Sequence, residues 1–296
     1  MAFQPDTYAY QPRLTEFDTI IRAAQRTIVS QVEAAVRSGD LSTVMGRRLQ
    51  LAAVTATLDH LGASVTPMAR RLVREAFDQG AARAAQQIVG LSVSAPEIPG
   101  AFAGVATHAV EAMQAAIEGR LTAAQRTIGR EVADIYAREQ RRSALRAILG
   151  AEGSPQAASK RMQLRLMQDK HIARAVKDAK TGFVDSAGKR WALDTYSNMA
   201  TRTVTREAVV QGAIARMASH GIALARVSKH ASSCEICLPY EGTLISLDGS
   251  MTEWKGQAVS DTEDIPPFHP NCAHSLEPVS TTMESLREEL ESETVG

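Results

Sequence analysis

Cysteine and histidine residues near the C-terminus place the strongest constraint on how this chain can fold. All three cysteines of the 296-residue chain lie in two short clusters, Cys234-Glu-Ile-Cys237 and His269-Pro-Asn-Cys272-Ala-His274. The two-residue gap in the first cluster allows both thiolates to reach one ion from a tight turn, and the second cluster can complete a tetrahedron from the far side of a loop. The fold must then bring together two segments that lie 31 residues apart.

Zn²⁺ is the ion that best suits this mixture of sulfur and nitrogen ligands, and four protein ligands make a closed, structural site. We expect Cys234, Cys237 and Cys272 to bind it together with one histidine. His269 repeats the two-residue spacing of the first pair, whereas His274 is the alternative ligand or a group that supports the site from outside. His230, four residues before the first cysteine, is a weaker candidate.

Two interpretations without a metal are open at this point. The cysteines can be small buried residues in hydrogen-bonded turns, or two of them can form a disulfide. The odd number of cysteines and the lack of a secretion signal in residues 1–10 argue against a disulfide framework. Because both clusters have paired spacing, the metal site is the favoured interpretation.

Residues 13–148 predict a helical N-terminal region. This segment is rich in Ala, Arg, Gln and Leu, and its apolar residues recur at three- and four-residue steps. Breaks are expected near residues 38–40, near 65–67 and at 92–100, where Gly and Pro interrupt the pattern. After the last break the apolar stripe continues for about 50 residues, either as one helix of roughly 75 Å or as pieces separated at Gly119 and Gly129.

Shorter elements are expected in the rest of the chain. A basic helix at residues 155–179 precedes a hairpin at 183–193, and a helix capped by Asp194 follows at 195–220 and ends at Gly221. Strands at 223–227 and 243–247 surround the two clusters. The predicted fold class is mainly α, with a long-helix N-terminal region and a small α+β C-terminal domain that holds a Cys/His knot. The expected domains are residues 1–181, 182–279 and an acidic helical tail at 280–296.

Charge is distributed unevenly although the net charge is zero. Residues 230–296 carry two basic and thirteen acidic side chains, which leaves thirty-one basic and twenty acidic ones in residues 1–229. Eleven of the basic residues lie between Arg138 and Lys180. Such an asymmetry is typical of proteins with charged partners or of self-association between oppositely charged regions. Few aromatic residues accompany the basic ones, so base stacking and sequence-specific reading of nucleic acid are not supported. No apolar run approaches the ~18 residues that a bilayer span needs, and we expect no membrane contact.

Several motifs resemble those of a known family when they are taken together in their order along the chain. They are residues 188–196 (GKRWALDTY), 202–208 (RTVTREA), 227–230 (VSKH), the Cys234-x-x-Cys237 pair, Tyr240-x-Gly242, and residues 267–274 (PFHPNCAH). The set resembles the minor head proteins of tailed bacteriophages, in particular the MuF-like head morphogenesis proteins and the related phage minor capsid proteins. It covers residues 182–279. Family members often have Arg at the position of Ala273 and Cys or His at that of His274, so the resemblance does not decide the fourth ligand.

The resemblance implies a structural role in the virion and no enzymatic activity. Such proteins lie inside the head near the portal vertex, in multiple copies, after assembly in the host cytoplasm. The implied partners are the portal protein, the major capsid or scaffolding protein, and packaged DNA through non-specific contact. The basic helices suit a compartment filled with DNA, and a structural zinc would stabilise a small domain with few aromatic residues.

Two other functions are alternatives. A metal-dependent nuclease or hydrolase would use His269 or His274 as the general base beside the ion, because a catalytic zinc keeps one coordination position open. A DNA-binding regulator with a zinc domain is less favoured, because the metal-bearing region is acidic. The chain has neither the His-x-Glu signature of zinc deaminases, nor a phosphate-binding Gly-rich loop, nor an H-E-x-x-H helix.

Overall fold

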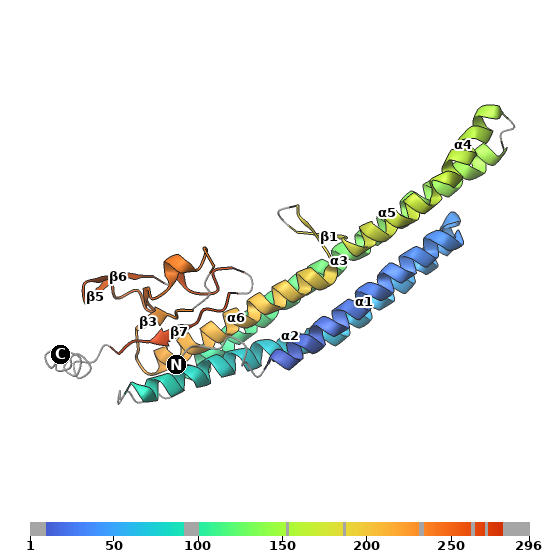
Figure 1. Ribbon diagram of the computed structural model, residues 1–296. Coiled ribbons are helices and arrows are strands. Elements are labelled where there is room, and N and C mark those ends of the chain that lie inside the picture. Colours follow the sequence, from blue (N-terminus) through green and yellow to red (C-terminus); the bar gives the residue numbers. More distant parts are fainter. Residues whose placement is uncertain are drawn as a thin grey trace. The chain divides into compact units, whose positions relative to one another are not determined.

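The computed structural model describes residues 10–91, 101–151, 154–185, 188–230, 234–261, 264–269 and 272–280. The described chain is mainly helical, with a small sheet near the C-terminus, which confirms the predicted fold class (Figure 1). Its helices are α1 (Gln11–Ser38), η1 (Asp40–Ser42), α2 (Val44–Gly90), α3 (Ala101–Ala151), α4 (Pro155–Leu166), α5 (Gln168–Lys180), α6 (Leu193–Ser219) and η2 (Leu238–Tyr240). Its strands are β1 (Phe183–Val184), β2 (Arg190–Trp191), β3 (Leu224–Val227), β4 (Leu244–Ser246), β5 (Glu253–Trp254), β6 (Gln257–Ser260) and β7 (Leu276–Pro278). Within these ranges, no helix combines the length and the apolar character that crossing a bilayer needs.

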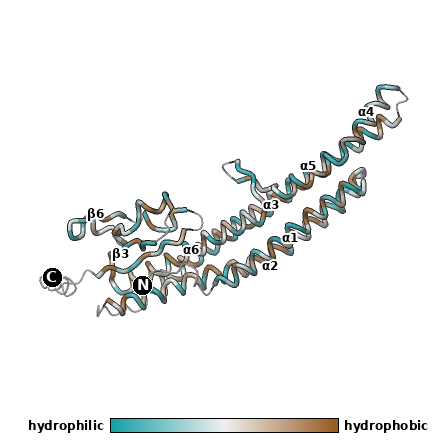
Figure 2. Tube along the Cα trace, in the orientation of Figure 1, coloured by the Kyte–Doolittle hydropathy of each residue, from teal (hydrophilic) through white to brown (hydrophobic). Residues whose placement is uncertain are grey.

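The long helices follow the predicted apolar pattern with two differences. α1 ends at Ser38 as expected, but α2 continues through Pro67, so the break expected near residues 65–67 is wrong. Val65 and Ala69 are fully buried on either side of the proline, and this packing outweighs the backbone hydrogen bond that the proline cannot form. The break expected at residues 92–100 lies outside the described residues. Figure 2 shows apolar residues recurring along each long helix.

α3 is one continuous helix of 51 residues, so neither Gly119 nor Gly129 interrupts it. Ile117, Leu121 and Ile128 are almost completely buried along its length, and this burial offsets the low helix propensity of glycine. The expected basic helix at 155–179 is instead two helices, α4 and α5, with a break at Met167.

Two compact units can be distinguished by their internal contacts. The first, here called the helical unit, consists of residues 15–68 and 118–198. The second, here called the sheet unit, consists of the described residues of 10–14, 69–117 and 199–280. The boundaries expected from the sequence, at residues 181 and 279, stay a prediction.

The helical unit is built from α1, the first part of α2, the later part of α3, α4 and α5. Gln31 on α1 donates a hydrogen bond to Thr57 on α2 over 3.1 Å, and Gln25 accepts one of 2.8 Å from the backbone N–H of Asp194. Its core is mostly aliphatic and includes Ile28, Val32, Val54, Leu61, Ile128 and Val132. α6 begins two residues earlier than expected, so Asp194 lies in its first turn. The β1–β2 hairpin lies at the expected position.

The sheet unit packs the ends of two helices against a five-stranded sheet. The strand order is β5-β6-β4-β3-β7, in which only the β4–β6 pair is parallel. β3 and β4 confirm the expected strands at 223–227 and 243–247. The core combines residues of α2, of α6 and of strands β3, β4 and β7, and it includes Ala84, Ile88, Val210, Ala213, Met217, Ala225, Val227, Ile245 and Leu276.

α2 and α6 approach each other unusually closely in the sheet unit. A Cβ atom at Gly80 would lie 1.9 Å from the carbonyl oxygen of Val209, and one at Gly212 would lie 2.0 Å from the carbonyl oxygen of Phe77. Each glycine therefore faces the backbone of the other helix, and only hydrogen atoms fit between them. α6 ends at Ser219, and the predicted glycine, Gly221, closes the turn that follows with a positive φ of 69°. There the N–H groups of Ile222 and Gly221 donate to the carbonyls of Met217 and Ala218.

Candidate metal centre

The pairing of β3 with β7 brings the two Cys/His clusters together. Val227 at the end of β3 pairs with Leu276 at the start of β7, and one residue further the backbone N–H of Ser228 donates to the carbonyl of Ser275 over 2.9 Å. The first cluster follows β3 and the second precedes β7. Because the two strands are antiparallel, both clusters emerge at the same end of the strand pair.

The first cluster is a tight turn held by its own backbone. The N–H groups of Cys237 and Leu238 both donate to the carbonyl of Cys234, each over 3.0 Å, and η2 follows directly. In the second cluster the N–H of Cys272 donates to the carbonyl of His269 over 3.1 Å. Each pair of candidate ligands is therefore closed by a hydrogen bond between its first and fourth residues, which directs both side chains toward the same side.

All five predicted ligands lie in one cluster. The Sγ atoms of Cys237 and Cys272 are 3.8 Å apart, and His269 places Nε2 3.0 Å from the Sγ of Cys237 and 3.3 Å from that of Cys234. The Nδ1 atom of His274 lies 3.6 Å from the Sγ of Cys272. The ligand atoms form two groups of three that share Cys237, and within each group every pair lies within 4.8 Å.

These separations suit a shared ion better than they suit a disulfide. Two thiolates bound to one tetrahedral zinc at about 2.3 Å are about 3.8 Å apart, whereas two sulfurs of a disulfide are about 2.05 Å apart. All three cysteines are free thiols. Cys237 and Cys272 are each only 1% exposed, so two of the sulfurs lie in a dry environment, which strengthens binding to a cation.

The carboxylate of Glu241 contacts the ring of His274 on the side away from the cysteines. Its Oε1 atom lies 2.9 Å from the Nε2 of His274, and it accepts a hydrogen bond of 2.8 Å from the backbone N–H of His230. A histidine ligand commonly donates its second ring N–H to a carboxylate, which fixes the tautomer and directs the other nitrogen toward the metal. In this arrangement Nδ1 of His274 is the nitrogen that faces the sulfur of Cys272.

Glu241 is the functional residue that sequence reasoning missed. Nothing in the local sequence indicates a partner for this carboxylate. The position does lie inside the Tyr240-x-Gly242 motif, and Gly242 has a positive φ of 76° with Lys229 in close contact. That motif was the available signal for a constrained turn beside the cluster.

His230 lies beside the cluster without joining either group of three. Its ring packs edge-on against that of His274, with centroids 4.4 Å apart, and its Nε2 lies 3.1 Å from the Oγ of Ser228. Burial, followed by the proximity of His274, lowers the pKa of His230. A neutral imidazole hydrogen-bonded to a hydroxyl suits a packing role, in agreement with its rank as the weaker candidate.

The two cysteines of the first cluster differ in acidity. A hydrogen bond from the backbone N–H of Cys237 is the main cause that lowers the pKa of the exposed thiol of Cys234. Burial is the main cause that raises the pKa of Cys237, with further contributions from the thiols of Cys234 and Cys272. A buried thiol of this kind ionises when a cation replaces its proton, so metal binding and proton release are coupled at Cys237.

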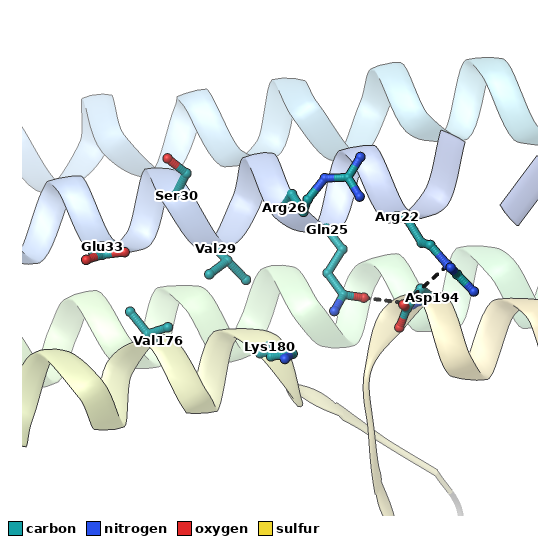
Figure 3. Close-up of a pocket in the computed structure, with 9 residues that line it drawn as sticks. All are labelled: Arg22, Gln25, Arg26, Val29, Ser30, Glu33, Val176, Lys180 and Asp194. Atoms are coloured by element: carbon teal, nitrogen blue, oxygen red, sulfur yellow. Dashed lines mark hydrogen bonds and ion pairs between the residues drawn. The ribbon is translucent and has the colours of Figure 1, made fainter. Parts of the chain in front are cut away.

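A separate groove lies in the helical unit between α1, α5 and the start of α6. Its volume is about 440 Å³, and Figure 3 shows Arg22 directed at Asp194 and Gln25 directed at the backbone of the same residue. The lining residues are Arg22, Gln25, Arg26, Val29, Ser30, Glu33, Val176, Lys180 and Asp194. This set contains neither histidine nor cysteine, and the polar contacts drawn in Figure 3 join the helices to one another. We assign structural contacts and no chemistry to this groove.

The fold and the cluster define the chain as a mainly helical protein whose small sheet carries a potential zinc knot. The family model for phage minor capsid protein 2 matches residues 47–294, which is most of the chain. The chain therefore belongs to the phage minor capsid protein 2 family. The match confirms the resemblance to phage minor capsid proteins, and the MuF-like assignment stays a prediction. No curated protein and no solved structure matched the chain.

Proposed function

We propose that the chain is a structural protein of the head of a tailed phage or prophage, that it associates with the portal, and that it acts in head assembly. The family match over residues 47–294 is the observation that carries this proposal, because a minor capsid protein must contact other head components. Under the proposal, residues 1–181 dock to the portal or to capsid subunits, and the Cys/His domain offers a second binding surface. The family match gives no support to the nuclease or hydrolase alternative.

The long helices support a docking role. A helix of 51 residues spans about 75 Å, so α3 can present many surface side chains along one line. Repeated contacts with neighbouring copies of an oligomeric partner need an extended surface of this kind. Basic side chains on the helices add the capacity for non-specific contact with packaged DNA.

Cross-linking of purified heads tests the assembly proposal. We expect the chain in several copies per head, with cross-links from the helical unit to the portal protein or to the major capsid protein. A chain that is absent from purified heads, or that is cross-linked only to tail proteins, would contradict the proposal. Point variants are preferable to truncation at residue 181, because residues 199–280 complete the same compact unit as residues 69–117.

We further propose that the cluster binds one structural zinc. Cys234, Cys237 and Cys272 supply the three sulfur ligands, and either His269 or His274 supplies the nitrogen. The burial of two sulfurs, the 3.8 Å separation between them and the carboxylate on the ring of His274 support this proposal. A closed tetrahedron of four protein ligands leaves no position for substrate, so the ion would hold the loops around the sheet in place.

Elemental analysis of the purified full-length chain tests the zinc proposal. We expect about one zinc per chain, with loss of the metal in Cys237→Ser and Cys272→Ser and retention in the control His60→Ala, whose side chain is exposed on α2. His269→Ala and His274→Ala, measured separately, identify the nitrogen ligand. A chain that purifies without zinc and does not bind it when zinc is added would show that the clusters are hydrogen-bonded turns.

A further inference from the structure

One part of the helical unit carries a dense positive charge. It consists of residues 138–180, which form the end of α3 together with α4 and α5, and it is called here the basic end. Eleven basic and four acidic residues give this segment a net charge of +7. Such a charge repels a second copy of the same surface and attracts an acidic partner.

The acidic residues of the basic end are largely used within it. Glu139 is paired with Arg142, and Asp178 accepts a hydrogen bond of 3.0 Å from Arg138. Arg142 and Arg174 also line a small cavity of about 100 Å³ between α3 and α5, together with His171. Burial, followed by the proximity of Arg142, lowers the pKa of His171.

Several cations of the basic end have no acidic partner. Among the described residues, Arg141, Lys160, Lys170 and Lys177 form no ion pair, and the Nε atom of Arg146 is buried without a hydrogen-bond acceptor. An acidic ligand can therefore approach without breaking existing pairs. The gain per exposed pair is small, so a stable complex must also bury apolar surface.

Apolar side chains are exposed beside these cations. Leu145 and Ile148 on α3 are 42% and 59% exposed, and Met162 on α4 and Met167 between α4 and α5 are 57% and 49% exposed. Ala157 is the only buried residue among the described side chains of 141–170. In Figure 2 the trace around α4 carries both apolar and polar residues. The described residues of the basic end thus offer exposed apolar side chains in the same segment as the unpaired cations.

A protein segment fits this surface better than nucleic acid does. Residues 138–180 contain no Phe, Tyr or Trp on which a base can stack. Phosphate contacts alone would leave the exposed Leu, Ile and Met side chains in water. An amphipathic acidic helix would pair its carboxylates with the cations, and its own apolar face would cover the exposed apolar side chains.

The chain itself carries a segment of this chemistry at residues 281–296, which lie outside the described residues. That segment has five glutamates and one arginine, a net charge of −4, and its Met283, Leu286 and Leu290 follow the three- and four-residue spacing of one helix face. Its sixteen residues would span about 24 Å as a helix, comparable with the about 18 Å of the twelve-residue α4. Charge, apolar spacing and length are therefore all complementary.

We propose that the acidic segment 281–296 of one copy of the chain docks on the basic end of a second copy. The contact joins copies head to tail, because the two surfaces that meet are different. Several copies in one head would then contact one another directly, without the portal protein. The segment buries its apolar face on the exposed side chains of α3 and α4, and its glutamates meet the unpaired cations.

A charge exchange in the full-length chain tests this proposal by sedimentation velocity at several protein concentrations. One variant reverses the basic end (Arg141→Glu, Lys160→Glu and Lys170→Glu), and the other reverses the tail (Glu284→Lys, Glu288→Lys and Glu291→Lys). We expect each variant alone to weaken self-association by about tenfold or more, which is about 1.4 kcal/mol. The chain that carries both sets should recover most of the loss, and added salt should weaken the wild-type complex.

Matched controls separate this contact from general effects of charge and of surface change. Arg48→Glu and Leu49→Ser alter exposed residues at the start of α2 and should leave association unchanged, whereas Ile148→Ser should weaken it without lowering the unfolding temperature. Three results would overturn the proposal. They are a chain that is monomeric at every concentration, association that ignores the tail reversal, and a basic-end variant that loses only DNA retention while its self-association is unchanged.

Discussion

Substituting Gly80 by alanine should destabilise the sheet unit although alanine is the better helix former. The new Cβ would lie 1.9 Å from the carbonyl oxygen of Val209, and a carbon atom approaches a carbonyl oxygen only to about 3.3 Å. α2 and α6 must therefore move apart by more than about 1 Å at this crossing. A gap of that size removes a quarter to a half of the dispersion energy of each atom pair across the interface.

The magnitude follows from two opposing effects. Replacing glycine by alanine inside a helix contributes about 1 kcal/mol in favour of the variant, and forced overpacking costs about 1–3 kcal/mol or more. The contact here involves backbone, which cannot rotate away, so the upper part of that range applies. We expect a net loss of about 2 kcal/mol in the free energy of unfolding. Gly212→Ala should behave alike, and the double variant should lose less than the sum, because one separation of the helices relieves both clashes.

Urea unfolding followed by circular dichroism measures this effect, and Gly104→Ala is the matched control. Gly104 lies on α3 in the same unit, and no atom comes within 4 Å of a Cβ placed there. Its substitution should raise the free energy of unfolding by up to about 1 kcal/mol. The reasoning is refuted if Gly80→Ala is as stable as the wild type, or if both substitutions destabilise the chain equally.

Three further predictions concern single side chains. If His274 is the nitrogen ligand, Glu241→Gln should weaken zinc binding by about 10- to 100-fold in a competition assay with a chelator, because the carboxylate orients that ring. The exposed control Glu253→Gln should bind zinc like the wild type. Tyr136→Phe should raise the free energy of unfolding at neutral pH by about 1 kcal/mol, because the buried phenol oxygen has no hydrogen-bond partner among the described residues. Burial raises the pKa of Tyr136 to about 12, so the wild type should lose stability as the pH rises from about 10 toward 12, and the variant should lose less in urea titrations over that range. Asp248 accepts hydrogen bonds from the hydroxyl and N–H of Ser250, and these bonds lower its pKa. The charged carboxylate therefore stabilises the fold above the usual aspartate pKa, and this stabilisation is lost as the pH falls through the lowered pKa. Asp248→Asn should flatten the acid side of the stability profile, and an unchanged profile would show that the turn does not depend on the charge.

The sequence pattern predicted elements well where local signals and packing agree. α1 ends at Ser38 and α6 ends at Ser219, and each helix is followed within two residues by a glycine of positive φ, Gly39 or Gly221. The break predicted near Pro67 was wrong because proline is a strong local signal against helix. The burial of Val65 and Ala69, which keeps the helix continuous, depends on contacts that only the folded chain makes. The break at Met167 had no local signal at all.

The sequence predicted that the two Cys/His clusters meet, but it did not predict that Glu241 contacts His274. Spacing alone indicated that residues 234–237 and 269–274 meet, because cysteines are rare in this chain and all lie there. Glu241 contacts His274 across 33 residues of chain, and the close approach of Gly80 to α6 spans an even longer separation. Contacts of this kind depend on strand register and helix crossing, which periodicity does not determine.

The discontinuous chain path of the sheet unit has a consequence for biosynthesis. α2 and its partner α6 leave the ribosome far apart in time, since translation at about 5–20 residues per second separates Gly80 from Gly212 by on the order of ten seconds. During that delay Ala84 and Ile88, which later face the sheet, have no native cover. A nascent chain that stops before α6 exposes an apolar surface and becomes a substrate for chaperones or proteases. The sheet unit can thus complete its core only after α6 and the strands that follow it have been synthesised.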